Sequence, residues 1–74
     1  MYQAMQKAVE ANRVAIVALL MACGPQEFWQ IKRECATQAY ADDESIQLAL
    51  RGLVADGQVI EDAEDGDTFY ELKD

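Results

Sequence analysis

The chain has 74 residues, of which 51% are hydrophobic and 27% charged, with one proline and a net charge of −8. This length suits one domain with a thin core, and the composition excludes a disordered chain. The longest apolar run, 14–23, is about half of what a membrane span needs, and the N-terminus has no signal-peptide pattern. We therefore expect a single cytoplasmic domain over 1–74 without a membrane partner.

The residues needed for most enzyme chemistry are missing from this sequence. It contains no histidine, so it offers no Ser–His or Cys–His pair, and its only serine, Ser45, falls where a helix cap is expected. Cys23 and Cys35 fall at apolar helical positions and are expected to be buried free thiols. Calcium is a weak alternative, because the stretch 62–67 lacks the distant glutamate of an EF-hand loop. We therefore predict no enzyme, no cofactor and no metal site.

The first predicted element is a helix over 1–23, which Gly24 ends because glycine adopts the left-handed conformation without strain. Alanine recurs along this helix at alternating steps of four and three, a heptad seam that lets helix axes approach closely. One alternative is that the seam seats the chain's own third helix. However, 14–23 is apolar on every face, which is more than one small domain covers. We therefore expect a homodimer through this helix, with Ala4, Ala8, Ala11, Ala15, Ala18 and Ala22 at the interface.

A second helix is predicted over 25–36, with Pro25 in its first turn, where the missing N–H of proline is tolerated. Trp29 lies beside the apolar face of this helix and is expected to close it. The apolar face itself has helical spacing and consists of Phe28, Ile31 and Cys35.

After a connecting segment, a third helix is predicted over 42–56. Asp42 or Asp43 is expected to accept hydrogen bonds from the free amides of its first turn, and Gly57 ends the helix. Its predicted apolar face comprises Ile46, Ala49 or Leu50, Leu53 and Val54.

Beyond the third helix the apolar period changes to two, which predicts a β-hairpin over 58–72. Asp65-Gly66 is a strong signal for a two-residue hairpin turn. Three helices followed by a two-stranded hairpin make an α+β fold. On the second strand we expect Tyr70 and Leu72 to pack with Val59 on the helices, and Phe69 to point the other way.

The stretch from Ile46 to Val59 is an apolar-x-x-Ala-Leu-basic-x-Leu run that ends in glycine before an apolar strand. It resembles the recognition helix and the start of the wing in winged helix-turn-helix proteins. "GPQEFWQIKRECA" is similar to that family's second helix, and "FYEL" to its closing strand. The resemblance implies a winged-helix fold over about 12–72, with the hairpin as the wing. The connection before the third helix is longer than a tight helix-turn-helix turn.

By the geometry of this family, the face that enters a major groove would hold Asp43, Glu44, Gln47, Leu48 and Arg51. Base reading favours Arg, Lys, Asn and Gln, so only Gln47 and Arg51 qualify. Carboxylates also repel the phosphates whose neutralisation gives DNA affinity. We therefore do not expect this chain alone to bind duplex DNA. The alternative is a dimeric transcription regulator with its acidic wings held away from the duplex, and with Lys32, Arg33, Gln47, Leu48 and Arg51 as DNA contacts.

The negative charge is concentrated at the C-terminal end. Residues 56–74 hold eight of the fourteen acids but only one of the six bases. Such a surface steers association with a basic partner and imitates nucleic acid, although a solubilising hairpin tip is the alternative. We predict a regulator or inhibitor that binds a basic protein surface. The DNA-binding regulator is the second interpretation, and a subunit of a larger assembly is the third. The predicted contacts are Asp43, Glu44, Glu61, Asp62, Glu64, Asp65 and Asp67.

Overall fold

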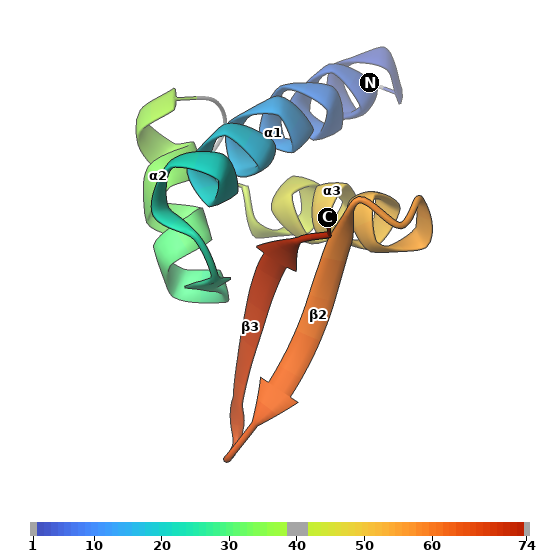
Figure 1. The fold of residues 1–74 in the computed structure, drawn as a ribbon. Coiled ribbons are helices and arrows are strands. Elements are labelled where there is room, and N and C mark those ends of the chain that lie inside the picture. Colours follow the sequence, from blue (N-terminus) through green and yellow to red (C-terminus); the bar gives the residue numbers. More distant parts are fainter. Residues whose placement is uncertain (1, 39–41, 74) are drawn as a thin grey trace.

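A computed structural model of the chain describes residues 2–38 and 42–73. It has three helices and a three-stranded antiparallel sheet, which confirms the expected α+β class. The helices gather at one end and the hairpin projects from them (Figure 1). None of the described helices is long and apolar enough to cross a membrane. In chain order the elements are α1 (Tyr2–Cys23), β1 (Gln26–Glu27), α2 (Phe28–Gln38), α3 (Asp43–Ala55), β2 (Val59–Glu64) and β3 (Asp67–Leu72).

The core lies where the three helices meet the base of the hairpin. Each helix contributes one isoleucine with no exposed surface, namely Ile16, Ile31 and Ile46. Burying a side chain of this size stabilises the fold by about 1.5–3 kcal/mol. The predicted contact between the hairpin and the helices is present, because Val59 is buried and both Tyr70 and Leu72 pack against the same cluster.

Two residues that were expected in the second helix form a strand instead. Gln26 and Glu27 pair with Tyr70 and Phe69 of β3, which gives the sheet the strand order β1-β3-β2. Pro25 therefore precedes a strand and does not open a helix. A strand this short has no periodicity, and its partner lies in a distant part of the sequence. The local pattern could not predict it.

The second helix begins at Phe28, later than the predicted start at residue 25. The Gln30 side chain accepts a hydrogen bond from the backbone N–H of Glu27 at 2.9 Å, as in one half of a capping box. The prediction that Trp29 closes the apolar face is wrong, because this side chain is 55% exposed. Its position is rotated by about 100° from that of Phe28, which turns it away from the core.

A buried polar pair, and not an aspartate side chain, fixes the first turn of α3. Asp42 is the N-cap residue, but its carboxylate accepts no capping hydrogen bond from the described amides, which corrects the prediction. Ser45 donates instead to the Asp42 carbonyl oxygen at 2.9 Å and accepts from Nδ2 of Asn12 at 3.0 Å. Both Ser45 and Asn12 are fully buried, so the pair fixes α1 against α3.

Replacing Ser45 with alanine should lower the free energy of unfolding by about 1–3 kcal/mol, because the Asn12 amide then loses this acceptor inside the core. The matched control Gln47→Ala, at an exposed position of the same helix, should change the stability by no more than about 0.5 kcal/mol. Urea unfolding of both variants beside the wild type measures the difference. A loss for Ser45→Ala no larger than that for Gln47→Ala would contradict the role given to this pair.

The two cysteines differ in burial, although both were expected to be buried. Cys35 is buried, and this burial, with a smaller effect of the Glu34 charge, raises the pKa of its thiol to about 11. Cys23 is exposed in the last turn of α1. Val54, predicted in the core, is likewise 37% exposed in the last turn of α3. Both predictions extended an apolar pattern to a helix end that the neighbouring elements do not cover.

The alanine seam of α1 is divided between the core and the surface. Ala8 and Ala15 are only 9% and 6% exposed and belong to the chain's own core. These two alanines were predicted as dimer contacts, but they are unavailable to another chain. For Ala8 and Ala15 the alternative prediction is correct, namely that the seam packs within its own chain. Of the others, Ala11 is half-buried, Ala18 and Ala22 are exposed, and the side chain of Ala4 lies outside the described residues.

Candidate functional site

The two faces of the hairpin present different side chains. Asp65 and Gly66 have φ angles of 52° and 85°, the two left-handed residues of a type I′ turn, as the sequence predicted. Tyr70 and Leu72 pack against the core, so the residues that alternate with them point away from the helices. On that side the register aligns Ile60 with Glu71, Asp62 with Phe69, and Glu64 with Asp67.

Strand β1 extends this surface by one more carboxylate. Glu27 aligns with Phe69 across the other edge of β3, so the two side chains point to the same side of the sheet. The surface therefore has carboxylates from all three strands around two apolar side chains. We term it the outer face, and it consists of Glu27, Ile60, Asp62, Glu64, Asp67, Phe69 and Glu71.

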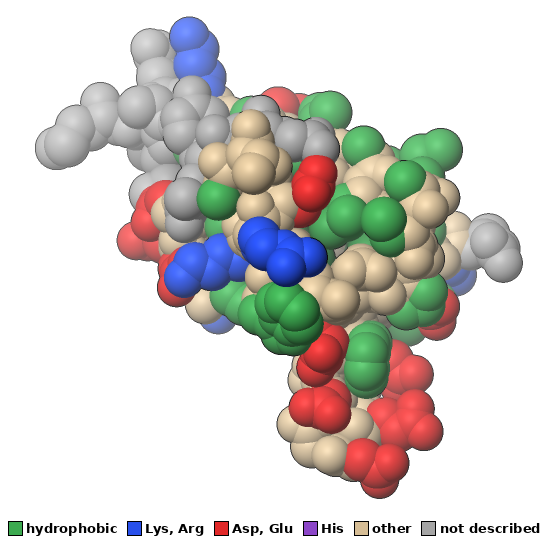
Figure 2. Space-filling view, turned by 90° about the vertical axis from the view of Figure 1, so that its left-hand side faces the viewer, with side chains coloured by type: hydrophobic (Ala, Val, Ile, Leu, Met, Phe, Trp, Pro, Cys, Tyr) green, Lys and Arg blue, Asp and Glu red, His purple; other side chains and the backbone are tan. Residues whose placement is uncertain are grey.

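Like charges face each other directly on the outer face. Glu64 and Asp67 are cross-strand partners beside the turn, a placement that destabilises a hairpin. Within the described part of the chain, neither carboxylate forms an ion pair with Lys or Arg. Figure 2 shows a cluster of acidic side chains at the free end of the hairpin, while Lys and Arg lie nearer the helices together with further acidic side chains. Folding therefore gains nothing from these charges.

An exposed tryptophan adjoins the outer face. The Nε1–H of Trp29 donates to the Glu27 carboxylate at 3.0 Å, and the Arg33 guanidinium lies 5.4 Å from the ring centroid. These two contacts hold the ring in place while 55% of the residue stays exposed. An aromatic side chain that is already positioned loses little conformational freedom on binding, a property of interface hot spots.

Glu61 does not lie on the outer face, although it was predicted with the other hairpin acids as a partner contact. It aligns with Tyr70, whose hydroxyl donates to the Glu61 carboxylate at 3.0 Å. Burial raises the pKa of Tyr70, and this hydrogen bond and the Glu61 charge raise it further. Glu61 and Asp62 are neighbours in the sequence, but side chains alternate along a strand, so they point to opposite sides.

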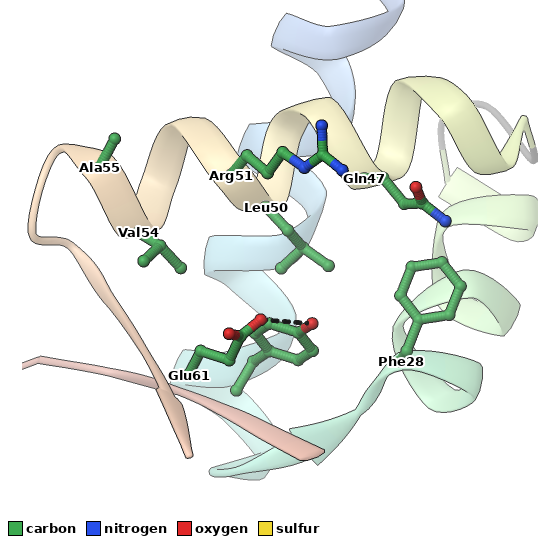
Figure 3. Close-up of a pocket in the computed structure, with 8 residues that line it drawn as sticks. Phe28, Gln47, Leu50, Arg51, Val54, Ala55 and Glu61 are labelled. Carbon is green, nitrogen blue, oxygen red and sulfur yellow. Dashed lines mark hydrogen bonds between the residues drawn. The ribbon is translucent and has the colours of Figure 1, made fainter. Parts of the chain in front are cut away.

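A groove with a volume of about 540 Å³ lies between α3 and the inner side of the hairpin. Figure 3 shows Arg51 and Gln47 along its α3 rim and Glu61 on the opposite side. Leu50 and Val54 of α3 point into it, and Phe28 lies at one end (Figure 3). The lining residues are Phe28, Gln47, Leu50, Arg51, Val54, Ala55, Glu61 and Tyr70.

Two basic residues of the DNA-reading alternative contact other side chains of this chain. Lys32 Nζ lies 2.8 Å from Oδ1 of Asp43, and Arg33 stacks over Trp29. Arg51 lies on the rim of the groove, which has Glu61 among its lining residues. Gln47 and Leu48 are exposed on α3. Of the predicted partner contacts, Asp43 and Glu44 lie in the first turn of α3, and Asp62, Glu64, Asp65 and Asp67 are exposed on the hairpin.

These features define a small α+β protein with an acidic outer sheet face. Over 2–38 and 42–73, no three or more Cys, Asp or Glu side chains are grouped so as to hold a metal ion. No protein-family model matches the sequence, and no curated protein matches it.

Among solved structures, the chain is similar to the crystal structure of smu.1704 from Streptococcus mutans UA159. The TM-score is 0.74 at 15% sequence identity, and the match covers 92% of this chain and 67% of that chain. At this identity the likeness concerns the fold alone.

Proposed function

We propose that this chain is a winged-helix protein that acts by binding a basic protein surface, as a regulator or inhibitor of that partner. The winged-helix assignment is supported by the order of the elements, in which α3 passes through Gly57 directly into the hairpin. The function is supported by the outer face, where Glu64 and Asp67 oppose each other at a cost to folding. These negative charges do not stabilise the fold, and a partner that neutralises them would explain their presence.

The outer face combines the two contributions that a protein interface needs. Its carboxylates attract a basic surface over a distance and so accelerate encounter. Phe69, Ile60 and the neighbouring Trp29 supply apolar area that stabilises the complex once water is excluded. Arginine and lysine side chains suit this surface, because their aliphatic stems cover apolar groups while their charged ends reach carboxylates.

A basic surface that normally holds nucleic acid is the partner class that we favour. Asp62 and Glu64 point to the same side of β2 at a separation of about 6.5–7 Å along the strand. Asp67 stands across from Glu64 on β3. These three carboxylates place negative charges several ångströms apart, as successive phosphates of a nucleic acid strand do.

Capture from a lysate of the native host, followed by identification of the bound protein, tests this function. Three forms of the full chain are compared: wild type, the triple variant Asp62→Asn/Glu64→Gln/Asp67→Asn, and the control Glu61→Gln. The wild type and the control should recover the same basic protein, and the triple variant should not. Equal recovery by all three forms, or the absence of a basic protein, would overturn the proposal.

The second candidate function is transcription regulation by reading duplex DNA. It is favoured by the exposure of Gln47, Leu48 and Arg51 on α3. A fluorescence anisotropy titration with random duplex at physiological salt separates the two functions. We expect no binding in the micromolar range, because the reading face and the hairpin are acidic. Micromolar or tighter binding that weakens steeply with salt would favour the DNA-binding alternative.

A further inference from the structure

One side of α1 carries an exposed apolar line of side chains that the chain itself does not cover. Val14 is 68% exposed and Met21 is 72% exposed, the largest values among the large hydrophobic residues whose exposure the structure describes. Ala18, also exposed, lies between them, and the half-buried Ala11 precedes them. Steps of three, four and three residues separate these positions, which is heptad spacing. We term Ala11, Val14, Ala18 and Met21 the α1 strip.

The charge distribution of the molecule indicates what can cover the α1 strip. The sequence has no charged residue over 14–26, whereas the chain as a whole carries a net charge of −8. The hairpin that carries most of the acids projects from the helices on the side away from α1 (Figure 1). Two copies of so acidic a chain repel each other unless they meet through neutral surfaces with their hairpins apart. The α1 strip is such a neutral surface, so it suits a second copy of the chain. It does not suit a basic partner, because it has no carboxylate.

The α1 strip is also complementary to itself in shape. Small and large side chains alternate along it. If two α1 helices pack antiparallel about a two-fold axis level with Ile16, Val14 of each copy lies opposite Ala18 of the other. Met21 then lies opposite Ala11, so each large side chain fills the space beside a small one.

A parallel pair of α1 helices would fit less well. In a parallel pair, each alanine would lie opposite the same alanine of the second copy, which leaves voids. Val14 would likewise meet Val14, and Met21 would meet Met21. This arrangement would also bring Lys7, which continues the heptad spacing toward the N-terminus, against Lys7 of the second copy.

We propose that this chain forms a two-fold dimer through an antiparallel pair of α1 helices, with the α1 strip as the interface. The proposal is independent of the proposed function, because it concerns another face of the molecule. It also differs from the dimer predicted from the alanine seam. Only Ala11 and Ala18 of the six seam alanines belong to this interface, and Val14 and Met21 supply its apolar area.

Sedimentation equilibrium of the full chain at high micromolar concentration tests the dimer. The wild type should have twice the chain mass of 8.3 kDa, and Val14→Glu should return it to 8.3 kDa with its helical circular dichroism retained. The matched control is Leu48→Glu, the same kind of change at a residue of α3 that is 38% exposed, and it should remain a dimer. If Val14→Glu loses helical signal, Met21→Glu takes its place. A monomeric wild type, or a dimeric strip variant that remains folded, would overturn the proposal.

Cross-linking tests the antiparallel register. Met21→Cys and Ala11→Cys are introduced into separate chains in a Cys23→Ala background, because Cys23 is exposed. A short bis-maleimide should join the two kinds of chain to each other when they are mixed, and should join Met21→Cys chains to themselves several-fold less. In the proposed dimer the two residues 21 are about 15 Å apart along the helix axis. Preferential cross-linking of residue 21 to residue 21 would show a parallel pair and overturn the register.

Discussion

Neutralising Asp62, Glu64 and Asp67 together should slow association with the basic partner about ten- to a hundredfold at low salt, with little change in the dissociation rate. The three carboxylates act over a distance, before the surfaces touch, so they affect encounter more than the lifetime of the complex. The Asp65-Gly66 turn is kept, so the hairpin should form as before. The difference should shrink as salt is added, because the Debye length falls to about 8 Å at physiological ionic strength.

Stopped-flow or surface-based kinetics with the captured partner measures both rates. The matched control neutralises Glu10, Glu44 and Glu61, which are exposed, lie off the outer face and change the net charge by the same amount. We expect this control to keep most of the wild-type association rate. If both triple variants slow association equally, the net charge of the molecule matters and the outer face does not.

Replacing Ile46 with alanine should lower the free energy of unfolding by about 2–5 kcal/mol. Ile46 has no exposed surface, and it packs with Ile16 of α1 and Ile31 of α2 in one cluster. Removing its outer carbons leaves a cavity that the neighbouring helices fill only in part. For a chain of this length the total stability is about 4–11 kcal/mol, so the variant should lose a large share of it.

Urea unfolding followed by circular dichroism measures this loss. Leu48→Ala, on the same helix but 38% exposed, is the matched control and should change the stability by no more than about 0.5 kcal/mol. Because the proposed dimer would contribute stability, all variants are compared at one protein concentration. A loss below about 1 kcal/mol for Ile46→Ala would mean that the three helices do not pack around this residue.

The elements that the sequence predicted correctly are those with a repeated local pattern. The helical period placed Ile31, Ile46 and Leu53 in the core, and the Asp65-Gly66 turn predicted the hairpin. Features that depend on contacts between distant residues were missed. Ser45 was expected to be a cap, but only its contact with Asn12 of α1 explains why a serine is fully buried there.

The outer face was predicted in part. Asp62, Glu64 and Asp67 were among the predicted partner contacts, whereas Phe69 and Glu71 were not, and Glu61 lies on the other side of the hairpin. Counting outward from the type I′ turn pairs the residues of the two strands and separates the two faces of the hairpin, so the sequence contained enough information to separate Glu61 from Asp62 and Glu64. The place of Glu27 could not be predicted in this way. Glu27 reaches the outer face through β1, which pairs with β3 from a distant part of the sequence.

The strand order β1-β3-β2 leaves β2 at the edge of the sheet, with one side of its backbone open to solvent. An open edge accepts a strand from another molecule, which is how many proteins begin to aggregate. Three of the six residues of β2 are Glu61, Asp62 and Glu64, so two such edges that approach each other bring like charges into register. Two of them, Asp62 and Glu64, belong to the outer face for which we propose a basic partner, so the same two carboxylates would also oppose the pairing of such edges into fibrils.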